Sequence, residues 1–401
     1  MREADSNGWA MGALLLAAQR IEIGRLEIVL PGGASRIFQG AVEGPSAKLI
    51  VRHRRAARRL MFGGNVGFAE AYMDGDWDTP DLAAVLELAA RNEAACNDLH
   101  YGKASALAPA LNLARRLWHA LRANTRTGSK KNIAYHYDLG NAFYSRWLDP
   151  TMAYSSAVYE PGIADLEDAQ RAKFRRMAEK LDVKPGQRVL EIGCGWGGFA
   201  AYLAKEYQAQ VTAITVSKEQ LEHTRAKVQS EGLGERIEAK FVDYRDVEGR
   251  YDRIASIEMF EAVGEKYWPA YFGKLREALA PGGRAALQII TIADRFFDSY
   301  RSGVDFIQRY IFPGGMLPSN AALAREYERA GLTLAKQEFF GLDYARTLAE
   351  WNARFQSRWT EIEPLGFDVR FKRMWEFYLA YCEAGFRSGS TDVTQVALVR
   401  P

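Results

Sequence analysis

Four glycines at the end of an apolar segment are the residues whose type and spacing most directly indicate ligand chemistry. The segment VLEIGCGWGGFA, residues 189–200, places Gly193, Gly195, Gly197 and Gly198 between a β-prone run and the apolar start of a helix. Glycines at a strand-to-helix turn let backbone approach a ligand closely and adopt positive φ without strain, and the helix end offers free N–H groups. The spacing is close to a dinucleotide-binding fingerprint. Taken alone, a tight packing turn is an equal alternative to a cofactor site.

The elements around this turn indicate the sheet that would hold it. Helix patterns alternate with five strand patterns, at residues 189–192, 210–216, 237–241, 251–257 and 284–290. This alternation predicts an α/β fold with a doubly wound parallel sheet and a ligand at the carboxyl ends of its strands. A nicotinamide fold usually carries Asp or Glu at the end of its second strand, where this chain has Thr215 and Ser217. Together with Glu191 and the turn LAPGG, the pattern resembles the class I S-adenosylmethionine methyltransferases, which are Rossmann-like.

The bulk composition is typical of a globular protein. The 401 residues are 48% hydrophobic and 26% charged with a net charge of +3, which is enough chain for two domains. No apolar run approaches the ~20 residues of a membrane span, and residues 11–18 read as a core helix rather than a signal peptide. Cys96, Cys194 and Cys382 lack paired spacing, which favours a reducing cytoplasm.

Metal chemistry and histidine catalysis find little support in the sequence. No Cys/His cluster has the spacing of metal ligands, so we predict no metal site. None of the five histidines follows His223. A mechanism that needs a histidine base from the residues after position 223 is therefore excluded.

We expect a smaller N-terminal α+β domain at residues 1–122, a linker at 123–131 and a catalytic domain at 132–401. The first domain has strand candidates at 21–30 and 47–51, separated by a Pro-Gly-Gly turn. The glycine-rich residues 63–67 predict a loop, with a helix starting over 68–73. Further helices are expected at 82–91 and 107–121, and the linker is polar and basic.

Two basic stretches suggest contact with an anionic surface. The first is residues 52–59, and the second comprises Arg115, Arg116, Arg122, Arg126, Lys130 and Lys131. They could dock on anionic lipid head groups, where each basic residue near the bilayer contributes ~1 kcal/mol. Solvated helix faces and a linker are an equal alternative. No nucleic-acid motif accompanies the charge, so nucleic acid is disfavoured.

Short motifs over most of the chain agree with one enzyme family. They are GFAEAYMDGDW at 67–77, HYDLGN at 136–141, MAYS at 152–155, EIGCGWGG at 191–198, TVSKEQ at 215–220, DYRD at 243–246, MFE at 259–261, YIFPG at 310–314, DY at 343–344 and FKRM at 371–374. On these residues the chain resembles the cyclopropane-fatty-acyl-phospholipid synthase family, which includes the mycolic-acid cyclopropane synthases.

The resemblance implies a reaction and a cofactor. The cis double bond of an acyl chain attacks the methyl group of S-adenosylmethionine, and the carbocation then loses a proton from the new methyl as a cyclopropane closes. By the same resemblance, the residues that should contact the cofactor are Tyr154, Ser155, Glu191, Gly193, Cys194, Gly195, Trp196, Gly197, Thr215, Val216, Gln220, Tyr244 and Arg245. Simple helix capping is the alternative role for Thr215 and Ser217, and core packing is the alternative for Tyr154.

The family's base is a bicarbonate ion, and here the chain departs from the pattern. The resemblance assigns bicarbonate to the positions of Ser156, Glu261, Gln288, Ile290 and Tyr344, of which Ser156 replaces a Cys and Gln288 replaces a His. A Gln amide can donate a hydrogen bond but cannot take up a proton or carry charge. Methyl transfer would survive these changes, whereas ring closure could give way to a methyl-branched alkene or a methylene chain.

The sequence thus predicts a cytoplasmic methyltransferase, peripheral at the inner membrane face. Its partner would be an unsaturated phospholipid, with dense aromatics in the last third lining an acyl tunnel and stabilising a cation through their π faces. A cyclopropane product is the first expectation, and a branched or methylene product is the alternative. A soluble amine or polyketide substrate, a non-catalytic lipid-binding homologue and a homodimer remain open.

Overall fold

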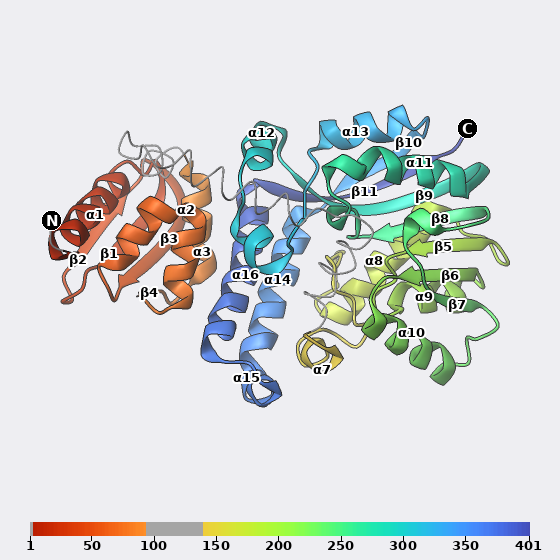
Figure 1. Ribbon diagram of the computed structural model, residues 1–401, viewed down its shortest axis with the longest axis horizontal. Helices are drawn as coiled ribbons and strands as arrows, with labels where there is room; N and C mark the ends of the chain where they lie inside the picture. The colour runs from red at the N-terminus through yellow and green to blue at the C-terminus, as the bar shows by residue number, and fades with distance from the viewer. Residues whose placement is uncertain (1–2, 94–138) are drawn as a thin grey trace.

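A computed structural model describes residues 3–93 and 139–401 of the chain. Two β-sheets organise these residues, a four-stranded sheet near the N-terminus and a seven-stranded sheet in the remainder (Figure 1). The expected linker, the second basic stretch, the helix at 107–121, Cys96 and residues 136–138 lie outside the described residues. The boundaries of the three-part division therefore stay a prediction.

The larger sheet has the order β10-β11-β9-β8-β5-β6-β7. Its five strands from β5 to β9 pair in parallel, while β10 and β11 pair antiparallel at one side. Apolar residues fill the central strands because helices cover both faces of the sheet. The strands are β5 (Arg188–Ile192), β6 (Gln210–Thr215), β7 (Ile237–Phe241), β8 (Tyr251–Ile257), β9 (Leu279–Ile292), β10 (Thr333–Phe339) and β11 (Thr391–Val399). This is the doubly wound parallel core that the sequence predicts.

Helices cover this sheet, and several begin at side-chain caps. Asp165, Ser217, Ser319 and Asp368 each accept a hydrogen bond from a backbone N–H in the first turn of their helix, which satisfies an otherwise free donor. The long helices here are α8 (Leu166–Leu181), α9 (Gly198–Glu206), α10 (Lys218–Ser230), α11 (Trp268–Ala278), α12 (Asp294–Ser302), α13 (Asn320–Arg329), α14 (Gly341–Ser357) and α16 (Val369–Ser388). Two single turns, α7 (Asn141–Tyr144) and α15 (Trp359–Ile362), complete the cover.

An aromatic core joins α7 to α14 and α16. Trp147, Trp351 and Trp375 are fully buried, and their rings meet at centroid distances of 5.7 to 6.0 Å. Many of the aromatic residues in the last third of the sequence are therefore core residues that hold the covering helices together. Large aromatic side chains are usually buried in this way.

The residues before position 94 form a unit of their own, here called the N-terminal unit. Its sheet has the order β2-β1-β3-β4, with β1 (Ile23–Val29), β2 (Ser35–Gln39), β3 (Val42–Val51) and β4 (Trp77–Asp78). Its helices are α1 (Glu3–Ala18), α2 (Arg55–Met73) and α3 (Leu82–Arg91). The loop predicted at 63–67 is reduced to a break at Gly64, where two helices meet within α2. The glycines there produce a kink at Gly64, with φ 61° and ψ −147°.

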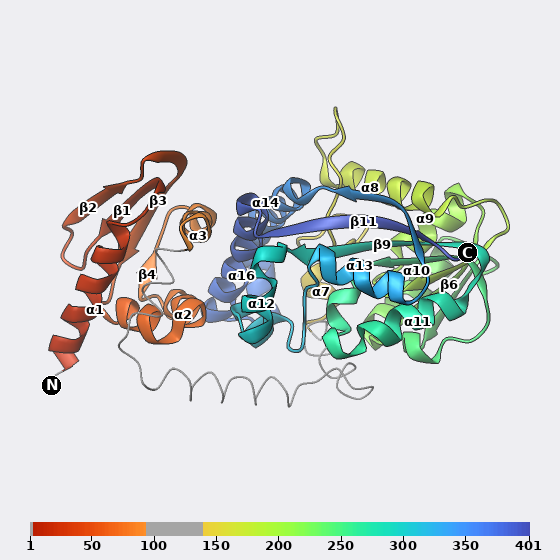
Figure 2. The same ribbon diagram turned by 90° about the horizontal axis from the view of Figure 1, so that it is seen from above.

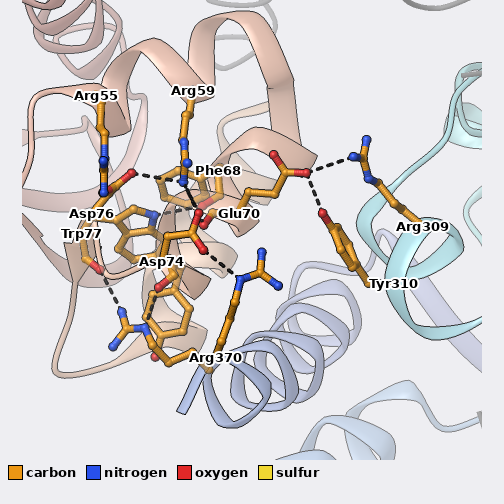
Figure 3. Close-up of polar contacts among 12 residues, drawn as sticks. Arg55, Arg59, Phe68, Glu70, Asp74, Asp76, Trp77, Arg309, Tyr310 and Arg370 are labelled. Atoms are coloured by element: carbon orange, nitrogen blue, oxygen red, sulfur yellow. Dashed lines mark hydrogen bonds and ion pairs between the residues drawn. The ribbon is translucent and has the colours of Figure 1, made fainter. Parts of the chain in front are cut away.

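The N-terminal unit packs against α16, which lies between it and the larger sheet (Figure 2). Polar contacts cross this junction (Figure 3): the Glu70 carboxylate accepts a hydrogen bond from the Tyr310 hydroxyl at 2.6 Å and lies 3.2 Å from Arg309. Asp74 accepts from Arg370 at 2.9 Å. We call these the seam contacts. They tie α2 to the short π-helical segment Ile307–Ile311 and to α16.

Candidate active site

The glycine-rich turn leaves open space above one residue. Gly193, Gly195 and Gly197 all have positive φ, between 53° and 81°, as a strand-to-helix turn of this kind requires. A Cβ at Gly195 would meet no atom within 4 Å, whereas one at Gly193 would meet Met259 and one at Gly197 would meet Thr224. Gly195 thus faces open space, and Gly197 serves the packing of the turn against α10.

A cavity of about 830 Å³ opens at the carboxyl ends of the parallel strands, where the fold predicts a ligand. Twelve of the thirteen residues that the resemblance assigns to the cofactor line it, and Gly197 is the exception. Glu261, Ile290 and Tyr344 line it as well, while Ser156 and Gln288 do not and are fully buried. The structure therefore brings together residues that are far apart in the sequence.

Local hydrogen bonds fix several of these side chains. The Thr215 hydroxyl donates to the side-chain amide oxygen of Gln220 at 2.9 Å, and Arg245 binds both carboxylate oxygens of Asp243, at 2.8 and 2.6 Å. The hydroxyls of Tyr154 and Tyr378 lie 2.7 Å apart. Helix capping, the alternative role for Thr215 and Ser217, applies to Ser217, which caps α10. Thr215 accepts a hydrogen bond from the Ser217 N–H at 3.1 Å and also lines the cavity.

A buried charge pair lies beside the glycine-rich turn. Lys173 of α8 is fully buried, donates to the Ser155 hydroxyl at 2.6 Å and lines the cavity. Burial lowers the pKa of Lys173 to about 8 and raises that of Glu191 to about 8. One carboxylate oxygen of Glu191 has no hydrogen-bond partner. Because an unpaired buried carboxylate is unfavourable, it suits a cationic ligand group, as the amino-acid end of S-adenosylmethionine would supply.

The cradle expected to hold bicarbonate is filled by a side chain of the protein. Glu258 accepts hydrogen bonds from the Ser156 N–H at 2.8 Å, the Gln288 amide at 2.7 Å and the Tyr344 hydroxyl at 2.6 Å. These are three of the groups that the resemblance assigns to bicarbonate. Glu258 also lines the cavity. These three groups are thus already satisfied by Glu258 and do not fit a free bicarbonate ion.

Glu261 is the second carboxyl group on this wall of the cavity. One of its oxygens accepts from the Ile290 N–H at 2.6 Å, and the other has no partner. Burial, reinforced by the nearby charge of Glu258, raises the pKa of Glu261 to about 8. Burial also raises the pKa of Glu258, but its three hydrogen bonds act in the opposite direction because they stabilise the anion. Near neutral pH Glu261 therefore carries a proton, whereas the hydrogen bonds of Glu258 favour its ionised form.

Glu258 and Lys173 are the site residues that sequence reasoning misses. Glu258 directly follows the fourth predicted strand, so its position at the carboxyl edge of the sheet was a usable signal. Lys173 gives no such signal, because a lysine in a helix is usually a surface residue.

Comparison with known proteins agrees with this geometry. The model of the mycolic acid cyclopropane synthetase family matches residues 124–396. The chain belongs to this family. The fold is that of a class I methyltransferase: the cyclopropane synthase MmaA2 of Mycobacterium tuberculosis superposes with a TM-score of 0.64 at 29% identity, over 67% of this chain and 98% of the other. The protein is thus an S-adenosylmethionine-dependent methyltransferase, and its family acts on lipid acyl chains.

Two relatives match along most of their length, including the N-terminal unit. The tuberculostearic acid methyltransferase of Mycobacterium tuberculosis is 40% identical over 368 residues, which cover 89% of this chain and 84% of the relative. The cyclopropane-fatty-acyl-phospholipid synthase of Escherichia coli is 36% identical over 363 residues, 88% of each chain. These two names describe different products, so the family alone does not decide between a ring and a branch.

The described residues contain neither a metal cluster nor a membrane-spanning helix. In residues 3–93 and 139–401 no group of three His, Cys, Asp or Glu side chains is arranged to hold a metal ion. None of the helices in the same ranges combines the length and apolar character needed to cross a bilayer.

Proposed function

We propose that the protein methylates the cis double bond of an unsaturated acyl chain in a phospholipid and completes the reaction with Glu258 as its base. The product is an open chain with a methylene or methyl branch, rather than a cyclopropane. The observation that carries this proposal is the Glu258 carboxylate, which occupies the cradle of Ser156, Gln288 and Tyr344. S-adenosylmethionine supplies an electrophilic methyl group when bound.

The geometry supplies what the carbocation needs. As the double bond takes the methyl group, one of its carbons becomes cationic, and Tyr154, Phe312 and Tyr378 on the cavity wall offer π faces to that charge. The lost proton goes to the ionised carboxylate of Glu258. Glu261, protonated near neutral pH, adds no second negative charge to compete with it.

The hydrogen bonds of Glu258 favour the open-chain product. Three donors stabilise the carboxylate and so make it a weaker base than burial alone would. Slower proton removal leaves time for a hydride shift along the chain, which needs no protein group, and loss of a methyl proton then gives a methylene branch. Loss of a neighbouring chain proton gives a methyl-branched alkene. The 40% identity to a tuberculostearic acid methyltransferase supports a branched product.

The decisive experiment combines product analysis with variants of Glu258. Purified protein, S-adenosylmethionine and vesicles of a monounsaturated phospholipid are incubated with and without bicarbonate, and the acyl chains are compared with cyclopropyl, methylene and methyl-branched standards by gas chromatography and mass spectrometry. We expect a branched product at a rate that bicarbonate does not change. Loss of a positioned base costs ~10²–10⁴ in rate, so Glu258→Gln should lose turnover to that extent and keep cofactor binding.

A second variant tests whether the cradle itself is intact. Glu258 has φ 49°, a conformation that glycine adopts without strain. Glu258→Gly should therefore empty the cradle without disturbing the turn, and added bicarbonate or formate should restore part of the activity. If the wild type needs bicarbonate, or if Glu258→Gln turns over normally, Glu258 is not the base.

Cyclopropane formation is the second candidate, and the 36% identity to the Escherichia coli synthase favours it. Gln288→His in the Glu258→Gly background restores the histidine that the family resemblance implies. If the missing histidine is what diverts the cation, this double variant should form more cyclopropane than the wild type. An exclusively cyclopropane product from the wild type would instead establish this second candidate.

We also propose that the enzyme works at a membrane surface, but through fewer arginines than the first basic stretch suggests. Arg55 and Arg59 lie 2.6 and 3.2 Å from the fully buried Asp76, and Arg59 also binds Asp74 at 2.6 Å. Those two arginines hold the fold of the N-terminal unit together. Several large apolar side chains of the same unit, among them Trp9, Leu16 and Phe62, are more than half exposed and could contact lipid.

A further inference from the structure

The cavity lined by the residues expected to contact the cofactor extends beyond the catalytic part of the chain. It continues past α16 into the N-terminal unit, where residues from all three helices and from β1 and β3 line it. We call this end the inner chamber. Its apolar lining includes Leu14, Leu26, Leu49, Leu60, Val85 and Leu88. The space is thus continuous from Gly195 and Glu258 to the interior of another sheet.

The chamber is mostly apolar, with Asn65, Asn92 and Glu93 as polar residues on its wall, and so suits an alkyl chain. Leu26, Leu60 and Met61 pack against the core of the unit but are only half-buried, so they present uncovered apolar surface to the cavity. The amide of Asn92 on this wall is already satisfied: it accepts from the N–H groups of Glu22 and Ile23 and donates to the carbonyls of Ile23 and Leu88. No hydrogen-bonding capacity of that side chain is left for a head group.

The volume of the cavity and the contacts between the N-terminal unit and the rest of the chain both support one ligand that spans the two. A volume of about 830 Å³ is near the top of the ~300–1,000 Å³ range of small-molecule sites, which is more space than a nucleoside cofactor alone would need. The seam contacts of Glu70 and Asp74 hold α2 against the Ile307–Ile311 segment and α16 beside this passage. The kink at Gly64 in α2 also lies on the cavity wall.

We propose that the inner chamber of the N-terminal unit is an acyl-chain binding site, so that the substrate extends from Glu258 into that unit. This inference rests on the proposed function, because it takes an acyl lipid as the substrate. The ligand chemistry is a saturated hydrocarbon segment. Its source is either the far part of the reacting chain or the second chain of the same phospholipid.

Photo-crosslinking tests the location directly. Two phospholipids are prepared, one with a diazirine near the methyl end of the monounsaturated chain and the other with the diazirine on the saturated chain. Each is bound to the full-length protein with S-adenosylhomocysteine, irradiated and mapped by peptide mass spectrometry. We expect labels on peptides of α2, α3 or β3 from at least one probe, and the probe that gives them identifies the source. Labels confined to residues 139–401 would overturn the proposal.

Filling the chamber provides the second test. Leu26→Trp and Leu60→Trp place a large ring in the space, while Ile37→Trp places the same ring on β2, where Ile37 is 60% exposed and does not line the cavity. We expect the first two variants to raise the KM for phospholipid about tenfold or more, with calorimetric affinity for S-adenosylhomocysteine unchanged. The Ile37 variant should match the wild type.

The two tests separate failure of this inference from failure of the proposed function. If the crosslinks map outside the chamber and the filling variants leave the KM unchanged while methylated lipid still forms, the chamber proposal is wrong and the proposed function stands. If no acyl lipid is methylated or bound at all, the proposed function fails. If a filling variant does not fold, the crosslinking result alone tests the chamber proposal.

Discussion

Glu258 and Glu261 lie three residues apart on the same wall of the cavity, yet their hydrogen-bond partners differ. Three donors surround Glu258, whereas Glu261 has one backbone partner and a free oxygen. The difference favours the anion at Glu258 and the neutral acid at Glu261, whose pKa is about 8. A pair of carboxyl groups whose environments differ in this way is a recurrent means of assigning acid and base roles.

Glu191 gives a pH-dependent prediction for cofactor binding. Its pKa of about 8 means that most of the carboxyl group is protonated at pH 6 in the free protein. A cationic ligand favours the ionised form, so S-adenosylmethionine should bind more tightly as the pH rises from 6 to 7.5, by up to about tenfold per pH unit. Titration calorimetry over this range measures the slope.

Two variants control that measurement. Glu191→Gln should bind more weakly and lose the slope, because the amide has no proton to release in this range. Gly195→Val places a side chain in the open space above the turn and should abolish binding at every pH. A wild-type affinity that is independent of pH would contradict the role given to Glu191.

Site residues that belong to a short sequence motif can be predicted from the sequence. Site residues that reach the cavity only through tertiary contacts cannot. Glu261 and Tyr344 follow from short motifs, and the structure places both on the cavity. Glu258 has no motif of its own, and its importance arises from Ser156 and Gln288, 102 and 30 residues away. Lys173 reaches the site from a helix whose sequence is otherwise that of a charged surface helix.

At the level of elements, α2 shows how one glycine can join two helices at a sharp bend. Gly64 has φ 61° and ψ −147°, a region that only glycine occupies readily, and a helix lies on each side of it. Gly67 then passes so close to Arg59 that a Cβ would lie 2.1 Å from its carbonyl oxygen. The two glycines together allow the second half of α2 to carry Glu70 and Asp74 to the seam.

Gly64→Ala and Gly63→Ala form a matched pair that tests this kink. The first change should lower the free energy of unfolding by about 1–3 kcal/mol, because alanine is strained at this φ and ψ. The second has open space and ordinary helical geometry, so it should be neutral or stabilise by ~0.5–1 kcal/mol. Urea denaturation of the two variants measures both values, and equal destabilisation would argue against a special role for Gly64.

The same helix explains why sequence reasoning succeeds for some elements and fails for others. Glycines at 63, 64 and 67 are typical of loops, but only Gly64 departs from helical geometry, so the predicted loop is reduced to a single break. Strand β7 and helix α3 agree with their predicted bounds because their patterns are clear. Strand β10 escapes notice because most of its residues are exposed, which removes the alternation that identifies a half-buried strand.

At the level of the whole molecule, the seam contacts should couple the N-terminal unit to turnover. Glu70→Ala removes the hydrogen bond from Tyr310 and the ion pair with Arg309, both partly exposed and together worth about 1 kcal/mol. We expect kcat/KM for phospholipid vesicles to fall about three- to tenfold, with cofactor affinity unchanged.

The exposed Glu43 on β3 offers the control for this change. Glu43→Ala removes the same charge from the same unit but far from the seam residues in the sequence, and it should leave kcat/KM near the wild-type value. If both variants lose activity equally, net charge at the lipid surface would explain the effect better than coupling through the seam.

The balance of charge around the cavity has a consequence for the form in which a fatty acid can enter. Glu191, Glu258 and Glu261 face the space, with the single ammonium of Lys173 among them, and the Arg245 guanidinium is neutralised by Asp243. Glu191 and Glu261, with pKa values of about 8, are mostly protonated near neutral pH in the free protein, and a bound cationic donor favours ionisation of Glu191. The carboxylate of Glu191, together with that of Glu258, then outweighs the charge of Lys173, and the resulting negative potential steadies a cationic transition state. It also repels a free carboxylate. We therefore expect an acyl ester, which is neutral, to be a much better substrate than the free fatty acid with the same chain, which is ionised.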